Sequence, residues 1–259
     1  MIDIRNVHLA KLSSEETAAL LPEGLIFLGF RGSIAHGMYV PQENPDSIDD
    51  KDIMGVYVSP REHYLGFGRP DVHERFIGEW DAVSYEVRKL IGLLLKGNPN
   101  VLSLLWLDPK HVIAKDPLWD LVIAERDAFV GKHVYHAFAG YAHGQFHRMT
   151  HGVKQGYMGA KRQILVEKYG FDCKNAAHLI RLLRMAIEFL TEGRLYVERA
   201  DSHDLLAIKR GEWTLDRVKA EAEGLFRLAQ EAYVRSPLPN KPDRDRAEAL
   251  CVRLIGSTL

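Results

Sequence analysis

Residues 29–58 read GFRGSIAHGMYVPQENPDSIDDKDIMGVYV, and the order of elements in this stretch determines the fold that we expect. The apolar run 25–30 leads into the stretch and is typical of a buried strand. Gly32 and Ser33 then predict a tight turn, where a glycine lets backbone N–H groups approach a phosphate and a serine adds a hydroxyl donor. The apolar run 53–58 predicts a second strand after the turn.

Two aspartates, Asp50 and Asp52, open the second predicted strand with one residue between them. Alternate residues of a strand point to the same face, so we expect both carboxylates on one face. Two such groups repel each other unless a cation lies between them, and hard oxygen ligands suit Mg²⁺ that also holds substrate phosphates. The alternative is a solvated acidic turn, which is the commoner origin of an isolated Asp-x-Asp because acidic residues are usually exposed.

Further elements are predicted on both sides of this stretch. Ser13 with Glu16 three residues later indicates a capping box at the start of a short helix. Residues 80–86 alternate and predict a third strand, and residues 87–96 predict a helix that ends at Gly97. The first part of the chain is therefore expected to be a small α/β domain.

The chain beyond about residue 117 is predicted to be mostly helical. The clearest helix is 174–191, where apolar residues recur at three- and four-residue spacing before Gly193. We expect the boundary between the α/β domain and a helical domain near residue 118.

Charge is distributed unevenly along the 259 residues. The whole chain has 34 Lys and Arg against 35 Asp and Glu, which excludes a grossly basic nucleic-acid-coating protein. Residues 1–118 carry twelve basic and seventeen acidic residues, whereas residues 131–184 carry nine basic and two acidic residues with six histidines. An acidic first part and a basic middle suit a site that handles a metal ion together with a phosphate.

Cysteine content and hydrophobicity indicate the compartment. The two cysteines, Cys173 and Cys251, are too few for a disulfide framework and fit a reducing cytoplasm. The N-terminus lacks the pattern of a signal peptide, and no apolar run approaches the ~20 residues that span a bilayer. We expect a soluble, cytoplasmic protein.

These motifs together resemble the DNA polymerase β-like nucleotidyltransferase superfamily. Its signature is a Gly-Ser pair, a short helix and an Asp-x-Asp that leads an apolar strand. The resemblance is closer to one branch, the predicted nucleotidyltransferases typified by the RNA-repair-associated polymerase-β-like proteins. It rests on residues 32–37, 50–58, 88–89 with 98–99, 174–184, 208–212 and 236–239. One departure is the gap of sixteen residues between Ser33 and Asp50, where residues 41–45 resemble a small loop insertion.

The resemblance implies an α+β fold and a metal-dependent reaction. A small mixed-sheet, polymerase β palm-like nucleotidyltransferase domain (1–118) would be followed by a helical bundle (119–259) that closes over the nucleotide or acceptor. The enzyme would transfer a nucleoside monophosphate from a nucleoside triphosphate to an acceptor hydroxyl or phosphate, release pyrophosphate and use Mg²⁺ or Mn²⁺. With this resemblance, the metal site is favoured over the solvated turn for Asp50 and Asp52.

The resemblance also implies a third carboxylate on a neighbouring strand, set between apolar residues. Asp81 matches that pattern, with Glu86 as the runner-up and Asp71 as a weaker alternative. Asp50, Asp52 and Asp81 are thus predicted as catalytic and metal-binding residues, and Asp81 would complete a two-metal site and act as general base.

Basic residues of the helical part are expected to meet the triphosphate, as the superfamily implies. We predict this role for Lys174, His178 and Arg181, with Lys161 next, in addition to Gly32 and Ser33. The alternative is a generic basic surface.

Three histidines, His143, His147 and His151, recur at four-residue spacing on one predicted helix face. Two histidines at this spacing can bind zinc, but neither a carboxylate nor a cysteine joins them locally. We therefore expect them to line a polar or phosphate-facing groove.

The acceptor, the base of the nucleotide and the oligomeric state stay open at this point. An RNA or tRNA is favoured as acceptor because of the basic middle and the branch resembled, while a small molecule or a protein side chain is the alternative. Two rival functions are a toxin-like nucleotidyltransferase that modifies tRNA or protein, and a catalytically silent nucleotide- or RNA-binding module. The intact Asp50–Asp52 pair argues against the silent module.

Overall fold

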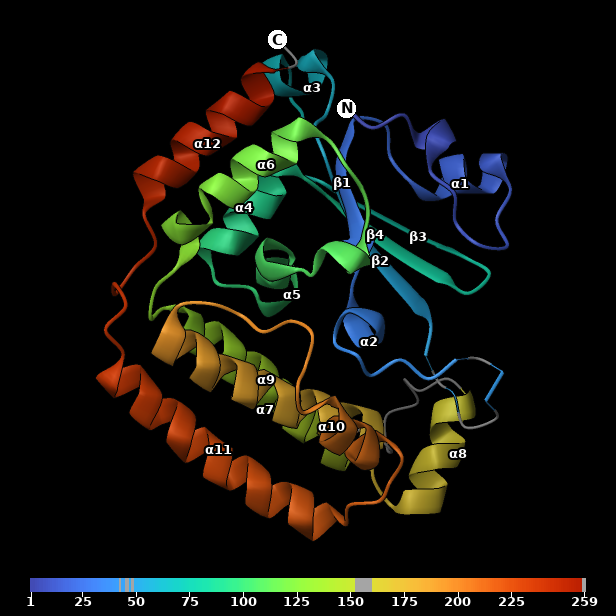
Figure 1. Cartoon of the computed structure of the whole chain (residues 1–259), viewed down its shortest axis with the longest axis vertical. Coiled ribbons are helices and arrows are strands. Elements are labelled where there is room, and N and C mark those ends of the chain that lie inside the picture. The colour runs from blue at the N-terminus through green and yellow to red at the C-terminus, as the bar shows by residue number, and fades with distance from the viewer. Residues whose placement is uncertain (42, 45–46, 48, 152–159, 258–259) are drawn as a thin grey trace.

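The computed structural model describes residues 1–41, 43–44, 47, 49–151 and 160–257. These residues form one five-stranded mixed sheet and a larger set of helices (Figure 1). The predicted α+β fold with a small mixed sheet is therefore confirmed. No helix in the described part of the chain combines the length and the apolar character needed to cross a bilayer.

The strands lie in the order β3-β4-β2-β1-β5. Their bounds are Leu25–Phe30 (β1), Lys51–Tyr57 (β2), Val72–Ile77 (β3), Trp80–Glu86 (β4) and Val112–Lys115 (β5). The neighbours β2 and β4 run parallel, and every other pair is antiparallel. Parallel strands need a crossover, which the chain makes through α3 and the edge strand β3.

The helices differ widely in length. The longer ones are α1 (Ser14–Leu20), α4 (Val87–Leu95), α6 (Pro117–Ala124), α7 (Val134–His151), α8 (Ala160–Tyr169), α9 (Cys173–Glu192), α10 (Ser202–Lys209), α11 (Leu215–Arg235) and α12 (Arg244–Gly256). Shorter ones are α2 (Gly32–Ala35), α3 (Arg61–Leu65), α5 (Pro99–Leu102) and the 3₁₀ turns η1 (Ile4–Asn6), η2 (Ser103–Trp106), η3 (Pro109–His111) and η4 (Arg126–Phe129).

Alternation along β2 gives the sheet two covered faces. Ile53 belongs to a small cluster with Leu20 of α1, whereas Met54 and Val56 belong to the main core with residues of α4 such as Leu90. Asp52 lies two residues before Met54, so its side chain is on the face of the main core.

Helix α9 is the centre of the helical part and packs against α7, α10 and α11 (Figure 1). Asp172 caps its first turn, and Gly193 ends it in the left-handed conformation with φ 73°. The last helix, α12, returns to pack against α4. The buried main core contains residues of both parts, including Leu90 and Leu183. The division near residue 118 stays a prediction.

Most of the predicted elements have the bounds that the sequence suggested. The strands 25–30 and 80–86 are found unchanged, and the capping box of Ser13 and Glu16 is present. The strand predicted at 53–58 begins two residues earlier and ends one residue earlier. The edge strands β3 and β5 were not predicted.

Candidate active site

The turn after β1 is built tightly around Asp52. The backbone N–H of Arg31 donates to the carbonyl oxygen of Asp52 over 2.9 Å. Gly32 follows with φ 59°, and a Cβ added there would overlap with Oδ2 of Asp52. A glycine is required at this position for both reasons. The turn and the aspartate therefore form one unit.

Asp52 and Asp81 lie side by side on neighbouring strands. They are register partners across the parallel pair β2–β4, and the guanidinium of Arg31 lies between them. Its Nη2 is 3.5 Å from Oδ1 of Asp52 and 3.2 Å from Oδ2 of Asp81. The Asp52 side chain is 24% exposed and that of Asp81 is 40% exposed, so Asp81 is the one that solvent reaches more freely.

Burial dominates the ionisation of Asp52. Desolvation raises the pKa of this carboxyl to about 6, although the cations of Arg31 and Lys174 lower it. The neighbouring carboxylates Asp81 and Asp50 raise the pKa further. A positive charge placed among these three aspartates would lower it again.

The two alternative carboxylates lie at the opposite end of the sheet. Glu86 pairs in register with Tyr57, is fully buried and caps the first turn of α4 by accepting from the backbone N–H groups of Arg88 and Lys89. The carbonyl oxygen of Asp71 accepts from the backbone N–H of Glu86, so Asp71 lies at that end too. Asp81 is thus the one candidate of the three that the strand register places beside Asp52.

A buried ion pair anchors the start of β2 to the helical part. Asp49 is 2% exposed and pairs with the ammonium of Lys209 at the end of α10. Its Oδ1 is 3.5 Å from Nζ of Lys174 on α9, and its Oδ2 accepts from the backbone N–H of Val40. Lys174 is therefore held close to the aspartates by Asp49. Sequence reasoning assigned no role to Asp49 or Lys209, because 160 residues separate them.

His36 of the Gly-Ser turn is tied to the helical part in the same way. Its Nδ1 is 2.7 Å from the carbonyl oxygen of Val197, and its Nε2 is 2.6 Å from Nη1 of Arg181. A carbonyl can only accept and a guanidinium can only donate, so the imidazole is neutral with its proton on Nδ1. Burial and the Arg181 charge keep the pKa of His36 well below its usual range.

Arg181 and His178 share one side of α9, as predicted. The guanidinium of Arg181 is buried, and burial lowers its pKa to about 10, which leaves it charged at neutral pH. His178 is half-buried, and burial together with Arg181 lowers the pKa of its imidazole well below the usual value. In the structure Arg181 positions His36, and the predicted contact of both residues with a triphosphate stays a prediction.

The remaining candidates are placed as follows. Oγ of Ser33 is buried without a hydrogen-bond partner in the described part of the chain, which leaves a donor on the turn for a ligand. Lys161 lies in α8, and its side chain is outside the described part. The ring of His143 stacks on Phe226 of α11 with centroids 4.3 Å apart, and the side chain of His151 is not described.

Residues 1–253 match the RNA repair pathway DNA polymerase beta family. The chain belongs to this family. Among solved structures, it is similar to a nucleotidyltransferase-like protein from Exiguobacterium sibiricum, with 12% identity, a TM-score of 0.31, and coverage of 84% of this chain and 72% of that chain. The comparison with curated proteins gave no match.

The donor set of this polymerase beta family member fits a hard divalent cation. The oxygen atoms that it offers belong to carboxylates, and the turn at Gly32 leaves space for Oδ2 of Asp52 where any side chain would fill it. The Arg31 guanidinium shows that a positive charge is accommodated between Asp52 and Asp81. As they stand, the described side chains contain no cluster of three or more Asp, Glu, His or Cys that could hold a metal ion. Arg31, whose guanidinium now lies between Asp52 and Asp81, would have to move for these two carboxylates to share one.

Gly32→Ala is expected to destabilise the protein by about 3 kcal/mol, because left-handed backbone strain adds to the overlap with Asp52. The matched control is Gly78→Ala. Gly78 has φ 60° with no atom within 4 Å of an added Cβ, so its replacement should cost about 1 kcal/mol from strain alone. Urea unfolding of both variants measures the difference. Equal losses would show that the turn does not close on Asp52.

Proposed function

We propose that this chain transfers a nucleoside monophosphate from a nucleoside triphosphate to an acceptor hydroxyl or phosphate. The observation that carries the proposal is the pairing of Asp52 with Asp81 across β2–β4, together with the Gly-Ser turn that packs against Asp52. The Asp50 carboxylate is near enough to raise the pKa of Asp52. The family to which the chain belongs supports it. The acceptor oxygen attacks the α-phosphorus, the bond from that phosphorus to the bridging oxygen breaks, and pyrophosphate leaves.

The chain's own residues would bind and orient the reactants. The backbone of the Gly32–Ser33 turn and the unpartnered Ser33 hydroxyl would hold triphosphate oxygens. Lys174, fixed by Asp49 and close to Asp52, would neutralise charge on the same groups. Asp81, the more exposed aspartate, would take the proton of the acceptor hydroxyl as it attacks.

Asp50, Asp52 and Asp81 would hold Mg²⁺ or Mn²⁺. When bound, such an ion neutralises charge on the transferred phosphoryl group and activates the acceptor oxygen. Arg31, which now lies between Asp52 and Asp81, would turn away from them toward phosphate oxygens. The part 119–259, which supplies Lys174, would close over the nucleotide as a helical domain.

An RNA end is the acceptor that we favour. The family name refers to RNA repair, and residues 131–184 form a basic segment in a chain whose other residues are acidic on balance. A protein hydroxyl or a small molecule would not require so extended a basic segment.

Pyrophosphate release tests the proposal. The protein is incubated with each of ATP, GTP, CTP and UTP, with Mg²⁺ or Mn²⁺, and with single-stranded RNA, tRNA or no acceptor. We expect pyrophosphate with at least one triphosphate when RNA is present, and none from the variant Asp50→Asn, Asp52→Asn. Nucleotide binding without pyrophosphate release under all these conditions would indicate a binding module. Modification of tRNA alone would indicate the toxin-like alternative.

Lys174→Ala is expected to weaken triphosphate binding roughly tenfold, because a charge-assisted hydrogen bond contributes about 1.5–3 kcal/mol. Monophosphate affinity should change little, because a monophosphate offers less charge and a shorter reach. Lys241→Ala, which removes an exposed lysine, is the charge-matched control. Calorimetric titration of ATP and AMP into both variants measures the contrast, and an equal loss for the two nucleotides would place Lys174 away from the triphosphate tail.

A further inference from the structure

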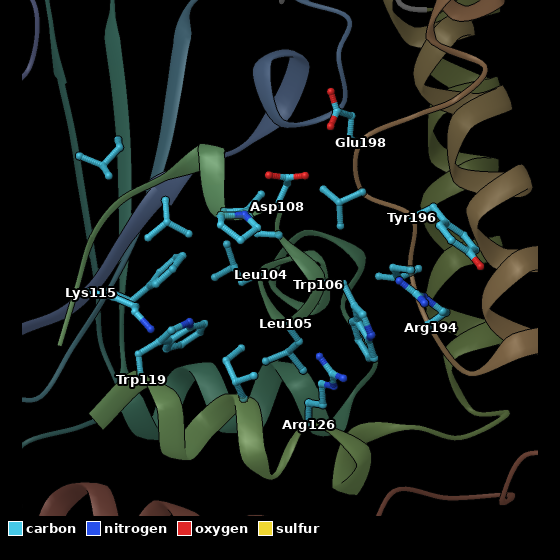
Figure 2. A pocket seen from close by; sticks show the side chains of 18 of the residues that line it. Leu104, Leu105, Trp106, Asp108, Lys115, Trp119, Arg126, Arg194, Tyr196 and Glu198 are labelled. Atoms are coloured by element: carbon cyan, nitrogen blue, oxygen red, sulfur yellow. The ribbon is translucent and has the colours of Figure 1, made fainter. Parts of the chain in front are cut away.

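A cavity of about 1040 Å³ lies on the main-core side of the sheet and includes none of Asp50, Asp52 and Asp81 in its lining (Figure 2). It is open to solvent and is lined by residues of β1, β5, the segment 104–109, α6 and the extended segment 194–200. This volume is at the upper end of the range for small-molecule pockets, which is about 300–1,000 Å³. The carboxylate site does not account for it.

Aromatic rings line much of this cavity. Trp106 is half-buried, with its edge against Phe189 at a centroid distance of 5.8 Å. Trp119 is buried in a stack with Phe27, whereas Tyr196 remains 39% exposed. Trp106 and Tyr196 therefore offer ring surface to a ligand, and Trp119 belongs to the floor.

Two arginines of the lining have no acidic partner within the described ranges. Arg126 lies over the Trp106 ring at 5.8 Å, and Arg194 lies over the Tyr196 ring at 4.8 Å. The other charged side chains of the lining are engaged: Lys115 with Asp120, Glu198 with Lys110, Arg199 with Glu188 and Asp201, and Asp108 with the backbone N–H of Lys110. The cavity thus presents unpaired positive charge beside exposed aromatic surface.

The cavity is on the same face of the sheet as the carboxylates. Phe27 lines the cavity, and Arg31 of the carboxylate site follows four residues later, directly after the end of β1. At the usual rise per residue of a strand, this spacing corresponds to about 13 Å along the chain. The segment 194–200 forms a wall of the cavity and also holds His36 through Val197. A strand of a few nucleotides could therefore occupy both sites at once.

We propose that this cavity binds one nucleotide unit, with its base against Trp106 and its phosphate at Arg126 and Arg194. In the view of Figure 2 the Trp106 ring lies between these two guanidinium groups. Aromatic rings stack on any base, and arginines hold the backbone, which is how single-stranded nucleic acid is bound with little sequence preference. The source of the unit is the acceptor strand, a few nucleotides from its reacting end, and in this respect the proposal rests on the proposed function.

Binding without catalysis tests the proposal. A fluorescein-labelled six-nucleotide RNA and, separately, AMP are titrated into the full chain in EDTA without triphosphate. The variants are Arg126→Ala with Arg194→Ala, and Trp106→Leu. Arg235→Ala is the control, because it removes an 80% exposed arginine on α11. We expect the double variant to bind the RNA about tenfold more weakly than the wild type does. The control variant should bind the RNA with the affinity of the wild type.

Tryptophan emission gives a second readout. The chain has four tryptophans, and stacking of a base on Trp106 should quench part of the emission. This quenching should disappear in Trp106→Leu. Should that variant fail to fold, the double arginine variant, which changes two side chains of the cavity lining and leaves Trp106 in place, still decides the question. Unchanged affinity for both RNA and AMP in the double variant would overturn the proposal.

The two ligands distinguish the source of the nucleotide. Tighter binding of RNA than of AMP, with both weakened in the double variant, supports the acceptor strand. If RNA and AMP bind with equal affinity and the double variant weakens both equally, the cavity binds a single nucleotide. That result overturns the acceptor strand as the source of the nucleotide. The chain could bind RNA through Arg126 and Arg194 and yet turn over no triphosphate. That result would support the cavity as a nucleotide-binding site and would contradict only the proposed transfer activity.

Discussion

Asp52→Asn is expected to lower the rate of nucleotide transfer by about a thousandfold or more. Loss of one metal ligand removes several kcal/mol of transition-state charge stabilisation, and each 1.36 kcal/mol is tenfold in rate. The amide has nearly the shape of the carboxylate, so the hydrogen bond from Arg31 to the Asp52 carbonyl should persist. Single-turnover assays measure the loss. Wild-type turnover by this variant would place the active site elsewhere.

The same variant should be more stable than the wild type in metal-free buffer above pH 6. The pKa of Asp52 is about 6 in the folded chain against 3.8 as its ordinary value. Because the folded-state pKa is the higher one, the stability gained by protonation is present below about pH 4 and is lost as the pH rises through 6. A shift of about two units corresponds to about 2–3 kcal/mol.

Thermal unfolding at pH 4 and pH 8 checks this expectation. The two proteins should have similar stability at pH 4 and differ at pH 8. Addition of Mg²⁺ or Mn²⁺ at pH 8 should then raise the unfolding temperature of the wild type and leave the variant unchanged. If the wild type is the more stable of the two at pH 8 without metal, the neighbouring cations offset the cost of burying the Asp52 charge in the metal-free chain.

Asp81→Asn is expected to reduce transfer about a hundredfold, whereas Glu86→Gln should keep transfer within a few-fold of the wild type. Both changes replace a carboxylate by its amide on β4, so they form a matched pair. Asp81 lies beside Asp52, and loss of a general base typically costs about 10²–10⁴-fold. Glu86 instead caps α4 and accepts from the hydroxyl of Tyr64.

Asp81→Asn should mainly affect turnover, whereas Glu86→Gln should mainly affect stability. Glu86→Gln should lose about 1–2 kcal/mol of stability, because a charged cap and its pairing with Arg88 become neutral. Turnover and urea unfolding are measured on both variants. Equal loss of turnover in the two would mean that the register of β4 does not select the functional carboxylate.

The sequence predicted those elements whose apolar pattern is strong. The runs 25–30 and 53–58 are continuous, and both form buried strands. The edge strand β3 was missed because half of its residues, VHERFI, are polar and the apolar ones do not alternate with them, as its half-exposed place at the edge of the sheet allows. The short strand β5 is only partly buried and carries too few residues to show a period.

The sequence indicated which carboxylates to consider as candidates, but it did not indicate which side chains contact them. The choice of Asp81 over Glu86 followed from the pattern that the family resemblance implied, a carboxylate between apolar residues, and the parallel register places Asp81 beside Asp52. Arg31, adjacent to the Gly-Ser turn, was missed because nothing local marks its contact with two aspartates. Helical spacing grouped Arg181 with His178 but could not tell that the guanidinium is buried against His36 from 145 residues away.

Transfer of label from the α-phosphate is the most direct measurement of nucleoside monophosphate transfer by this chain. The protein is given single-stranded RNA, Mg²⁺ and a nucleoside triphosphate labelled at either the α- or the γ-phosphate, beside the variant Asp50→Asn, Asp52→Asn. We expect the α-label to become covalently attached to RNA, the γ-label to leave in pyrophosphate, and the variant to transfer neither. Attachment of the γ-label, or α-label transfer that survives in the variant, would show that the chain does not transfer a nucleoside monophosphate at these aspartates.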